Sequence, residues 1–258
     1  MTVVLKKMWH IVLYKICCIT VIHLTGEADY SMFGGSYAVA RKSERRRKMI
    51  KKNLKTLIVT SILIVLPVLA GIILWDRLPE QMPTHWNAAG DIDGWTNKPF
   101  TVFGLPLILL AGQWLCVLGT LADPKKENHP TKILHLVLWI IPVLSLVLGT
   151  ITYATALGKT VRVEVIMPIL IGLILAIIGN YMPKCKQNYT IGIKIPWTLN
   201  SEENWNRTHR FAGWLWTFSG IVVMLTGFFG GFWIFLIIVL LMVLAPILYS
   251  YLLFRKGI

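Results

Sequence analysis

The sequence predicts an all-α polytopic membrane protein, folded as a bundle of six transmembrane helices. Its 258 residues are 55% hydrophobic and only 15% charged, which is too little charge to cover the surface of a soluble domain of this length. Six apolar runs are long enough to cross the hydrocarbon core of a membrane, which takes about 20 residues. Lysine and arginine cluster beside the ends of these runs.

The six apolar runs contain no Lys, Arg, Asp or Glu, and their one histidine is His135. Proton-coupled pumps and channels keep charged groups in the middle of the membrane, because those groups carry the ion. The composition of the runs therefore argues against active transport. Run five has Gly213, Gly220 and Gly227 on one face, a pattern that favours close helix packing. The runs are 56–75, 100–122, 133–157, 165–183, 211–229 and 232–254.

The distribution of basic residues predicts how the chain is threaded. Lys and Arg are frequent before run one, between runs two and three, between runs four and five, and after run six, and they are scarce in the other loops. Cytoplasmic loops carry the excess of Lys and Arg. We therefore expect both termini in the cytoplasm and the loop that contains His85 on the outside. The same clustering accounts for the net charge of +14 without any direct contact to nucleic acid.

The loop between runs one and two, LPEQMPTHWNAAGDIDGW (78–95), predicts a small folded extracellular unit rather than a slack connector. Pro79 and Pro83 restrict the backbone, and the Gly-Asp and Asp-Gly pairs that follow favour turns. Trp86 and Trp95 are suited to a membrane interface. A single histidine among carboxylates is weak support for a metal site. We expect His85 to be hydrogen-bonded and no metal to be bound.

The segment GNYMPKCKQNYTIGIKIPWTLNSEENWNRTHRFAGWLW (179–216) is rich in asparagine and aromatic residues. A polar residue near the end of span four, Asn180, is expected to be buried and hydrogen-bonded. The alternating isoleucines at 191, 193 and 195 predict an extended, strand-like or interfacial run. We also expect Trp197, which follows Pro196, to be exposed.

A helix start is predicted at Asn200, followed by Ser201 and two glutamates, with a glutamate at the third helical position. The helix is expected to continue directly into span five. Trp205, His209 and Gly213 are four residues apart and should therefore share one face. His209 is expected to make a fixed hydrogen bond rather than to act as a pH-sensitive contact.

The residues do not predict an enzyme. Nucleophile–base pairs, paired carboxylates and metal-ligand spacings are all missing from the sequence, and Ser201 stands at a helix cap rather than in a nucleophile elbow. The four cysteines show no C-x-x-C or Cys/His pattern and are expected to be free thiols. We expect no cofactor.

Two blocks of sequence closely resemble the SdpI-like membrane proteins, a family of immunity factors against a secreted, membrane-killing bacterial peptide toxin. The first block is LPEQMPTHWNAAGDIDGWTNK and the second is GNYMPKCKQNYTIGIKIPWTLNSEENWNRTHRFAG, and the resemblance extends from Met49 to the C-terminus. One departure is Lys194, which stands where the family pattern has arginine. Lysine keeps the charge but lacks the bidentate geometry of a guanidinium group.

The resemblance implies a multi-pass protein of the bacterial plasma membrane, in contact with lipid, that binds or neutralises a secreted peptide toxin. It also implies signalling through a cytoplasmic DNA-binding repressor. The toxin is expected to meet the outer loop at Pro83, His85, Trp86, Asn87, Gly94 and Trp95. The cytoplasmic partner is expected to meet a motif formed by Asn180, Pro183, Asn188, Gly192, Lys194, Pro196, Trp197, Trp205, Arg207, Thr208, His209 and Arg210. The alternative function is a transporter that exports a toxin or a small solute.

Three segments are predicted along the chain. Residues 1–48 form an atypical leader, and we expect the true start of the protein at Met49. Arg45 and Arg46 stand just before Met49 and can be encoded by AGGAGG, a bacterial ribosome-binding sequence, so that residues 1–48 would be translated upstream sequence. Residues 49–131 form a two-span unit with the outer loop. Residues 132–258 form a four-span SdpI-like unit with a cytoplasmic loop at 184–210.

Overall fold

The computed structural model describes residues 35–125, 131–229 and 232–258, and for 35–50, 52, 131–133 and 232 it describes the backbone alone. The predicted leader lies outside the described residues up to position 34. The rest of the predicted leader is the beginning of helix α2 (Gly35–Ile73).

Six helices in the described part of the chain are long and apolar enough to cross a membrane, which confirms the predicted number of spans. A short helix, α6 (Pro196–Asn200), precedes the fifth of them. The predicted and observed spans differ by a few residues at most of their ends. The fifth starts nine residues earlier than predicted, because its helix begins within the segment that connects it to the fourth span. The long helices are α2, α3 (Leu105–Ala122), α4 (Thr131–Ala156), α5 (Val163–Tyr181), α7 (Glu202–Phe229) and α8 (Phe232–Arg255).

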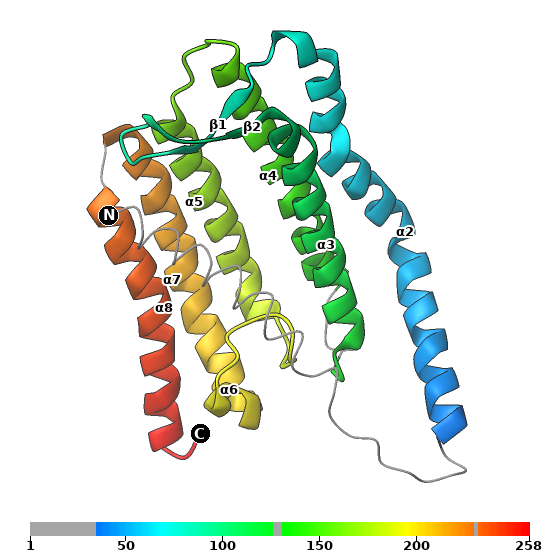
Figure 1. Cartoon of the computed structure of the whole chain (residues 1–258). Helices are drawn as coiled ribbons and strands as arrows, with labels where there is room; N and C mark the ends of the chain where they lie inside the picture. The colour runs from blue at the N-terminus through cyan, green and yellow to red at the C-terminus, as the bar shows by residue number, and fades with distance from the viewer. Residues whose placement is uncertain (1–34, 126–130, 230–231) are drawn as a thin grey trace.

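The six long helices form two groups of three (Figure 1). Helix α2 packs against α3 and α4, whereas α7 packs against α5 and α8, and α5 with α7 is the most extensive helix pair of the molecule. Between the groups, α4 and α5 meet at only a few positions. The division predicted at 131/132 assigned the third span to the C-terminal unit. The packing instead places α4 with α2 and α3.

The α2–α3–α4 group is joined by buried polar side chains. A polar group in lipid must find a partner inside the protein, because no water is available to it. Two atoms are exceptions among the described residues of this group, since Gln113 Oε1 and Thr155 Oγ1 are buried without a hydrogen-bond partner. The interhelical bonds include His135 Nε2 with Asn53 Oδ1 (2.8 Å), Gln113 Nε2 to Thr60 Oγ1 (3.0 Å), Ser145 Oγ to the Ile64 carbonyl (2.8 Å) and Tyr153 OH to the Pro67 carbonyl (2.8 Å).

The α5–α7 pair is joined by glycines that let the two backbones touch. A Cβ atom on Gly220 would lie 2.5 Å from the backbone nitrogen of Ala176, and one on Gly227 would lie 2.9 Å from the carbonyl oxygen of Val165. Gly213 packs in the same way against Pro183, at 2.7 Å. The predicted role of these three glycines in close packing is confirmed.

The loop between α2 and α3 is folded as an antiparallel β-hairpin of strands β1 (Gln81–Trp86) and β2 (Ile92–Asn97). It lies across one end of the bundle, beside the end of α4 (Figure 1). Pro83 pairs with Trp95, and it is tolerated because this position of the ladder needs no donor from β1. The prediction of a folded loop is confirmed, and the hairpin adds a small sheet to an otherwise helical protein.

Candidate functional site

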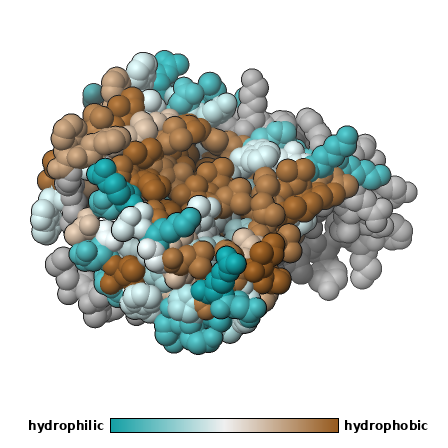
Figure 2. All heavy atoms as spheres, turned by 90° about the horizontal axis from the view of Figure 1, so that it is seen from above, coloured by the Kyte–Doolittle hydropathy of each residue, from teal (hydrophilic) through white to brown (hydrophobic). Residues whose placement is uncertain are grey.

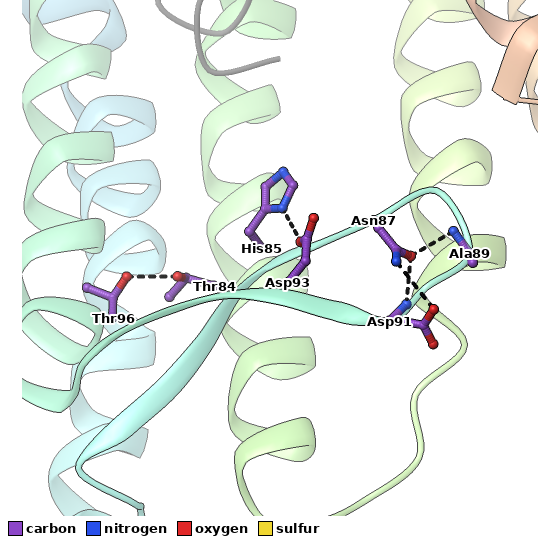
Figure 3. A network of polar contacts seen from close by, with 7 residues as sticks. All are labelled: Thr84, His85, Asn87, Ala89, Asp91, Asp93 and Thr96. Carbon is purple, nitrogen blue, oxygen red and sulfur yellow. Dashed lines mark hydrogen bonds and ion pairs between the residues drawn. The ribbon is translucent and has the colours of Figure 1, made fainter. Parts of the chain in front are cut away.

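The hairpin holds its shape through polar contacts among its own residues (Figure 3). His85 Nδ1 hydrogen-bonds Asp93 Oδ1, which confirms the predicted hydrogen-bonded histidine. At the turn, Asn87 Oδ1 accepts hydrogen bonds from the backbone nitrogens of Ala89 (2.9 Å) and Asp91 (3.0 Å). An asparagine that binds the backbone two and four residues on stabilises a tight turn. The turn is therefore fixed without any contact to a ligand.

A buried lysine fixes the base of the hairpin. Lys98 is 6% exposed, and its ammonium group donates to the Leu78 carbonyl (3.1 Å) and pairs with Glu80 (2.7 Å). It also lies 4.9 Å from the centre of the Trp75 ring, in a cation–π contact. This arrangement ties the end of α2 to the end of β2. Sequence analysis treated Lys98 only as one of the few basic residues of this loop. The one sequence signal that could have indicated its structural role was its position shortly after a predicted turn.

The predicted toxin-facing residues divide by exposure. His85, Asn87 and Trp95 are exposed, and Trp86 and Gly94 are half-buried. Pro83 is buried, so it can support a recognition surface but cannot contact a ligand. The backbone at Gly94 passes so close to His85 that a Cβ atom there would lie 2.6 Å from the histidine Cβ.

At the opposite end of the bundle, the segment between α5 and α7 packs around two residues of α7, Trp205 and His209. Their rings stack at 4.0 Å, and both side chains are fully buried. The Trp205 indole donates to the Cys185 carbonyl (2.7 Å). His209 donates from Nδ1 to the Trp205 carbonyl (2.8 Å) and accepts at Nε2 from the Ile193 nitrogen (3.0 Å). The predicted fixed hydrogen bond of His209 is confirmed.

No strand forms at 191–195, where an extended, strand-like or interfacial run was predicted, because side chains rather than a neighbouring strand bind this backbone. Asn188 Oδ1 accepts from the nitrogens of Thr190 (2.9 Å) and Ile191 (2.7 Å), and Thr198 Oγ1 donates to the Ile193 carbonyl (2.7 Å). Gly192 has a φ of +122°, a conformation that glycine adopts without strain. The result is an irregular loop wrapped around His209.

A carboxylate from the other helix group binds this loop. Asp123, just after α3, accepts hydrogen bonds at Oδ2 from the Tyr189 nitrogen (3.0 Å) and the Thr190 hydroxyl (2.5 Å). Lys194 donates to the Thr190 carbonyl (2.9 Å). Burial lowers the pKa of Lys194, and the charge of Asp123 opposes that shift. Lys194 is thus half-buried and held against the loop. Sequence reasoning missed Asp123 because its partners are more than 60 residues away.

Burial decides which residues of the predicted cytoplasmic motif can meet a partner. Asn188, Trp205, Thr208 and His209 are buried, Gly192, Lys194 and Trp197 are half-buried, and Asn180, Pro183, Pro196, Arg207 and Arg210 are exposed.

Two predictions about this segment are wrong and one needs a small correction. Asn180 is exposed rather than buried, because it lies on the outer side of α5. Trp197 is not free, since its ring packs 5.2 Å from that of Tyr251. The helix start is confirmed, with Ser201 Oγ accepting from the Asn204 nitrogen (3.2 Å), so that asparagine rather than glutamate is the third helical residue.

The described residues offer no evident chemistry for catalysis or metal binding. Within residues 35–125, 131–229 and 232–258, no group of three His, Cys, Asp or Glu side chains is placed to hold a metal ion. Burial raises the pKa of the Cys185 thiol from 9.0 to about 11, which makes it a poor nucleophile at neutral pH.

Comparison with known proteins gives the chain a family. Residues 184–250 match the SdpI/YfhL protein family, and residues 62–110 match a domain of unknown function, DUF1648. The chain is 31% identical to the immunity protein SdpI of Bacillus subtilis over 201 residues, which cover 77% of this chain and 92% of the relative. No solved structure matches. The two matched segments fall in the two helix groups, and the chain belongs to the SdpI family of membrane immunity proteins, as a multi-pass protein of the bacterial plasma membrane.

Proposed function

We propose that this protein protects its cell by binding or neutralising a secreted peptide toxin at the hairpin end. The relative that carries the name immunity protein supports the activity. The observation that supports the place is the hairpin itself, which exposes His85 and Trp95 while its shape is fixed by internal bonds. A pre-organised polar and aromatic surface is suited to recognition, because little conformational freedom is lost on binding.

The hairpin end also offers the mixed surface that an amphipathic peptide requires. Figure 2 looks onto this end of the molecule and shows hydrophilic residues beside a broad hydrophobic area. A membrane-active peptide approaching from outside would meet both kinds of surface there. We place the hairpin outside and both termini in the cytoplasm, because exposed basic residues such as Lys184, Lys186 and Arg210 gather at the opposite end.

For the cytoplasmic end we propose a docking surface for a DNA-binding repressor. Arg207 and Arg210 are exposed on the first turns of α7, and Arg207 pairs with a surface glutamate, Glu203 (2.5 Å). Arginine is enriched among the residues that carry binding energy at protein interfaces. Trp205 and His209 are buried, so their part is to hold the loop in place rather than to touch the repressor.

Protection of a sensitive bacterium from the family's peptide toxin tests the proposed immunity. His85→Ala should weaken protection at unchanged membrane abundance, since the ring is exposed and the bonds of Asn87 that fix the turn remain. Lys186→Ala, an equally exposed change at the other end, is the control and should protect fully. If His85→Ala is lost from the membrane, or if it protects as well as the wild type, the hairpin is a folding element and not the recognition surface.

The proposed signalling has its own test. Arg207→Ala should abolish toxin-induced transcription and leave protection intact, because the arginine lies at the end away from the hairpin. Loss of both outputs together, at normal protein level, would refute the separation of the two faces.

A further inference from the structure

The hairpin is anchored in one helix group and touches the other. Met82 of β1 is fully buried and packs with Val102 and Tyr153 in a hydrophobic cluster of the α2–α3–α4 group. The hairpin turn, in contrast, lies against α5. A Cβ atom on Gly90 would lie 2.5 Å from Glu164 Oε2 and 3.3 Å from Glu164 Cβ, in the first turn of that helix. We call this contact between Gly90 and Glu164 the hairpin bridge.

Both sides of the hairpin bridge are ordered. Gly90 has a φ of +88°, which glycine adopts without strain, and its nitrogen donates to the Asn87 carbonyl (3.1 Å). The Asn87 side chain closes the same turn (Figure 3). On the helix side, Arg162 Nε lies 3.4 Å from Glu164 Oε1. Because neither side is slack, a displacement of the hairpin turn is transmitted to the start of α5.

A second connection between the groups lies at the other end of the bundle. Asp123, which follows α3, accepts the hydrogen bonds of Tyr189 and Thr190, and we call this contact the loop bridge. Lys125 supports it by donating to Gln187 Oε1. A hydrogen bond is lost once its donor and acceptor are about 3.6 Å apart. The loop bridge therefore persists only while the two groups keep their present separation at this end.

Between these two bridges, little fixes the angle between the helix groups. Helices α4 and α5 meet at only a few positions, and the short segment 157–162 joins them at the hairpin end (Figure 1). Helix α5 has 19 residues and is therefore about 28 Å long, at about 1.5 Å per residue. A tilt of about 5° at the hairpin end moves its far end by about 2 Å, which is enough to break the loop bridge. Helix α7 moves with α5, because their backbones touch.

We propose that the hairpin controls the loop at 187–194 through the tilt between the two helix groups. While the hairpin bridge is intact, the loop bridge also forms and the loop stays folded around His209. A ligand that displaces the hairpin turn from Glu164 tilts α5 and α7 and breaks the loop bridge. The loop is then released from the first turns of α7, where Arg207 is exposed. The inference rests on the proposed function, because it names the path by which a toxin at the hairpin alters the docking surface.

The native thiol of Cys185, just before the loop, reports whether the loop is closed. Its residue is 6% exposed, and its carbonyl accepts from the Trp205 indole (2.7 Å). Burial raises the pKa of the thiol to about 11, which keeps it unreactive at neutral pH. The test uses the full chain in nanodiscs, with Cys17→Ala, Cys18→Ala and Cys116→Ala as the background. The rate at which a maleimide labels Cys185 then measures how often the loop opens.

The decisive variant is Gly90→Leu, because its side chain cannot fit between the hairpin turn and Glu164. It should raise the labelling rate of Cys185 about fivefold, although the change lies at the other end of the molecule. Gly158→Leu is the matched control, since Gly158 also has a positive φ, of +78°, but nothing lies within 4 Å of an added Cβ. It should be labelled at the wild-type rate.

A second variant enlarges the same contact from the helix side. Glu164→Phe stands at a position with regular helical backbone, so it replaces Gly90→Leu if that variant is not recovered from the membrane. The same increase in labelling is expected. Asp123→Asn, which weakens the loop bridge directly, should also raise the labelling rate.

Three results would overturn the inference. If Asp123→Asn raises the labelling rate while Gly90→Leu and Glu164→Phe leave it unchanged, the hairpin does not control the loop. Equal increases for Gly90→Leu and Gly158→Leu assign the effect to backbone strain. An unchanged rate for Asp123→Asn shows that the loop stays closed without the loop bridge.

The labelling experiment needs no toxin, so it separates this inference from the proposed function. If Gly90→Leu raises the labelling rate but the wild type does not protect cells, the control of the loop stands and the immunity proposal fails. If the wild type protects cells but Gly90→Leu and Glu164→Phe are labelled at the wild-type rate, the immunity proposal stands and the control of the loop is wrong.

Discussion

The two helix groups associate through different chemistry. In the α2–α3–α4 group, Ser145 and Tyr153 reach across to backbone carbonyls of α2, each at 2.8 Å. In the α5–α7–α8 group, glycines such as Gly220 bring two backbones into direct contact. Lipid tails are as apolar as leucine, so neither group can rely on the hydrophobic effect to hold its helices together.

The difference predicts how well each helix group tolerates amino-acid substitutions. An interhelical hydrogen bond in a membrane contributes only about 0.6 kcal/mol on average, and its partners can find other acceptors. A backbone contact at glycine has no such freedom, because any side chain must push the helices apart. We expect the first group to be adaptable and the second to be rigid. The hairpin connects two helices of the first group, and the loop at 187–194 connects two helices of the second.

The largest expected effect comes from Gly220→Ala. Its new Cβ would lie 2.5 Å from the Ala176 nitrogen, so α5 and α7 must separate, at a cost of about 3 kcal/mol. Thermal unfolding of the purified protein in detergent measures the loss. Gly112→Ala in α3 is the matched control, since nothing lies within 4 Å of its added carbon. Equal stabilities of the two variants would contradict the proposed rigidity of the second group.

The next effect concerns the bond between the groups. Asp123→Asn should lower the free energy of unfolding by about 2 kcal/mol, because a buried carboxylate loses charge-assisted bonds to Tyr189 and Thr190. Unfolding should also broaden or split, as the two groups become less coupled. Glu202→Gln, an exposed change, should leave the transition as it is. A sharp, unshifted transition for Asp123→Asn would show that the groups are coupled elsewhere.

Between pH 8 and pH 10.5, a decline in stability of about 2 kcal/mol is expected from Cys185. Its pKa is raised from 9.0 to about 11 in the folded protein, so its contribution is complete below pH 9 and is lost as pH rises to about 11. Lys194, whose pKa is lowered, acts with the opposite sign but is present in every variant. Unfolding at pH 8 and pH 10.5 should show a smaller decline for Cys185→Ala than for the wild type. Parallel declines would contradict the assignment.

The smallest expected effect is that of Tyr153→Phe. Removing the hydroxyl deletes the bond to the Pro67 carbonyl and should cost about 1 kcal/mol or less. Thr150→Val provides the comparison, because the Thr150 hydroxyl bonds only within its own helix. Thermal unfolding again gives the readout. A loss as large as that of Gly220→Ala would show that the first group is no more adaptable than the second.

The sequence predicted the elements that follow from periodicity and composition. The six spans, the folded loop, the helix start near Ser201 and the shared face of Trp205, His209 and Gly213 all came from such patterns. Each depends on residues that are close together in the chain, so the physical cause is visible in a short window.

Contacts between distant residues could not be predicted in this way. The alternating isoleucines at 191–195 have the period of a strand. The side chains of Asn188 and Thr198, however, form hydrogen bonds to that backbone in place of a neighbouring strand. Asp123 looks like an ordinary loop carboxylate until the fold brings it to Thr190. Lys98 is likewise an ordinary charge until the fold brings its ammonium group to the Leu78 carbonyl. In the candidate site, the residue types were predictable, whereas their burial was not.

The side of the membrane on which the hairpin lies tests the central claim most directly. In a background with Cys17, Cys18, Cys116 and Cys185 replaced by alanine, single cysteines are introduced as Asp91→Cys and Lys186→Cys, both at exposed positions. A membrane-impermeant maleimide applied to intact cells should label Asp91→Cys and spare Lys186→Cys until the cells are opened. The reverse pattern would place the hairpin in the cytoplasm, away from any toxin that arrives from outside, and would contradict the account.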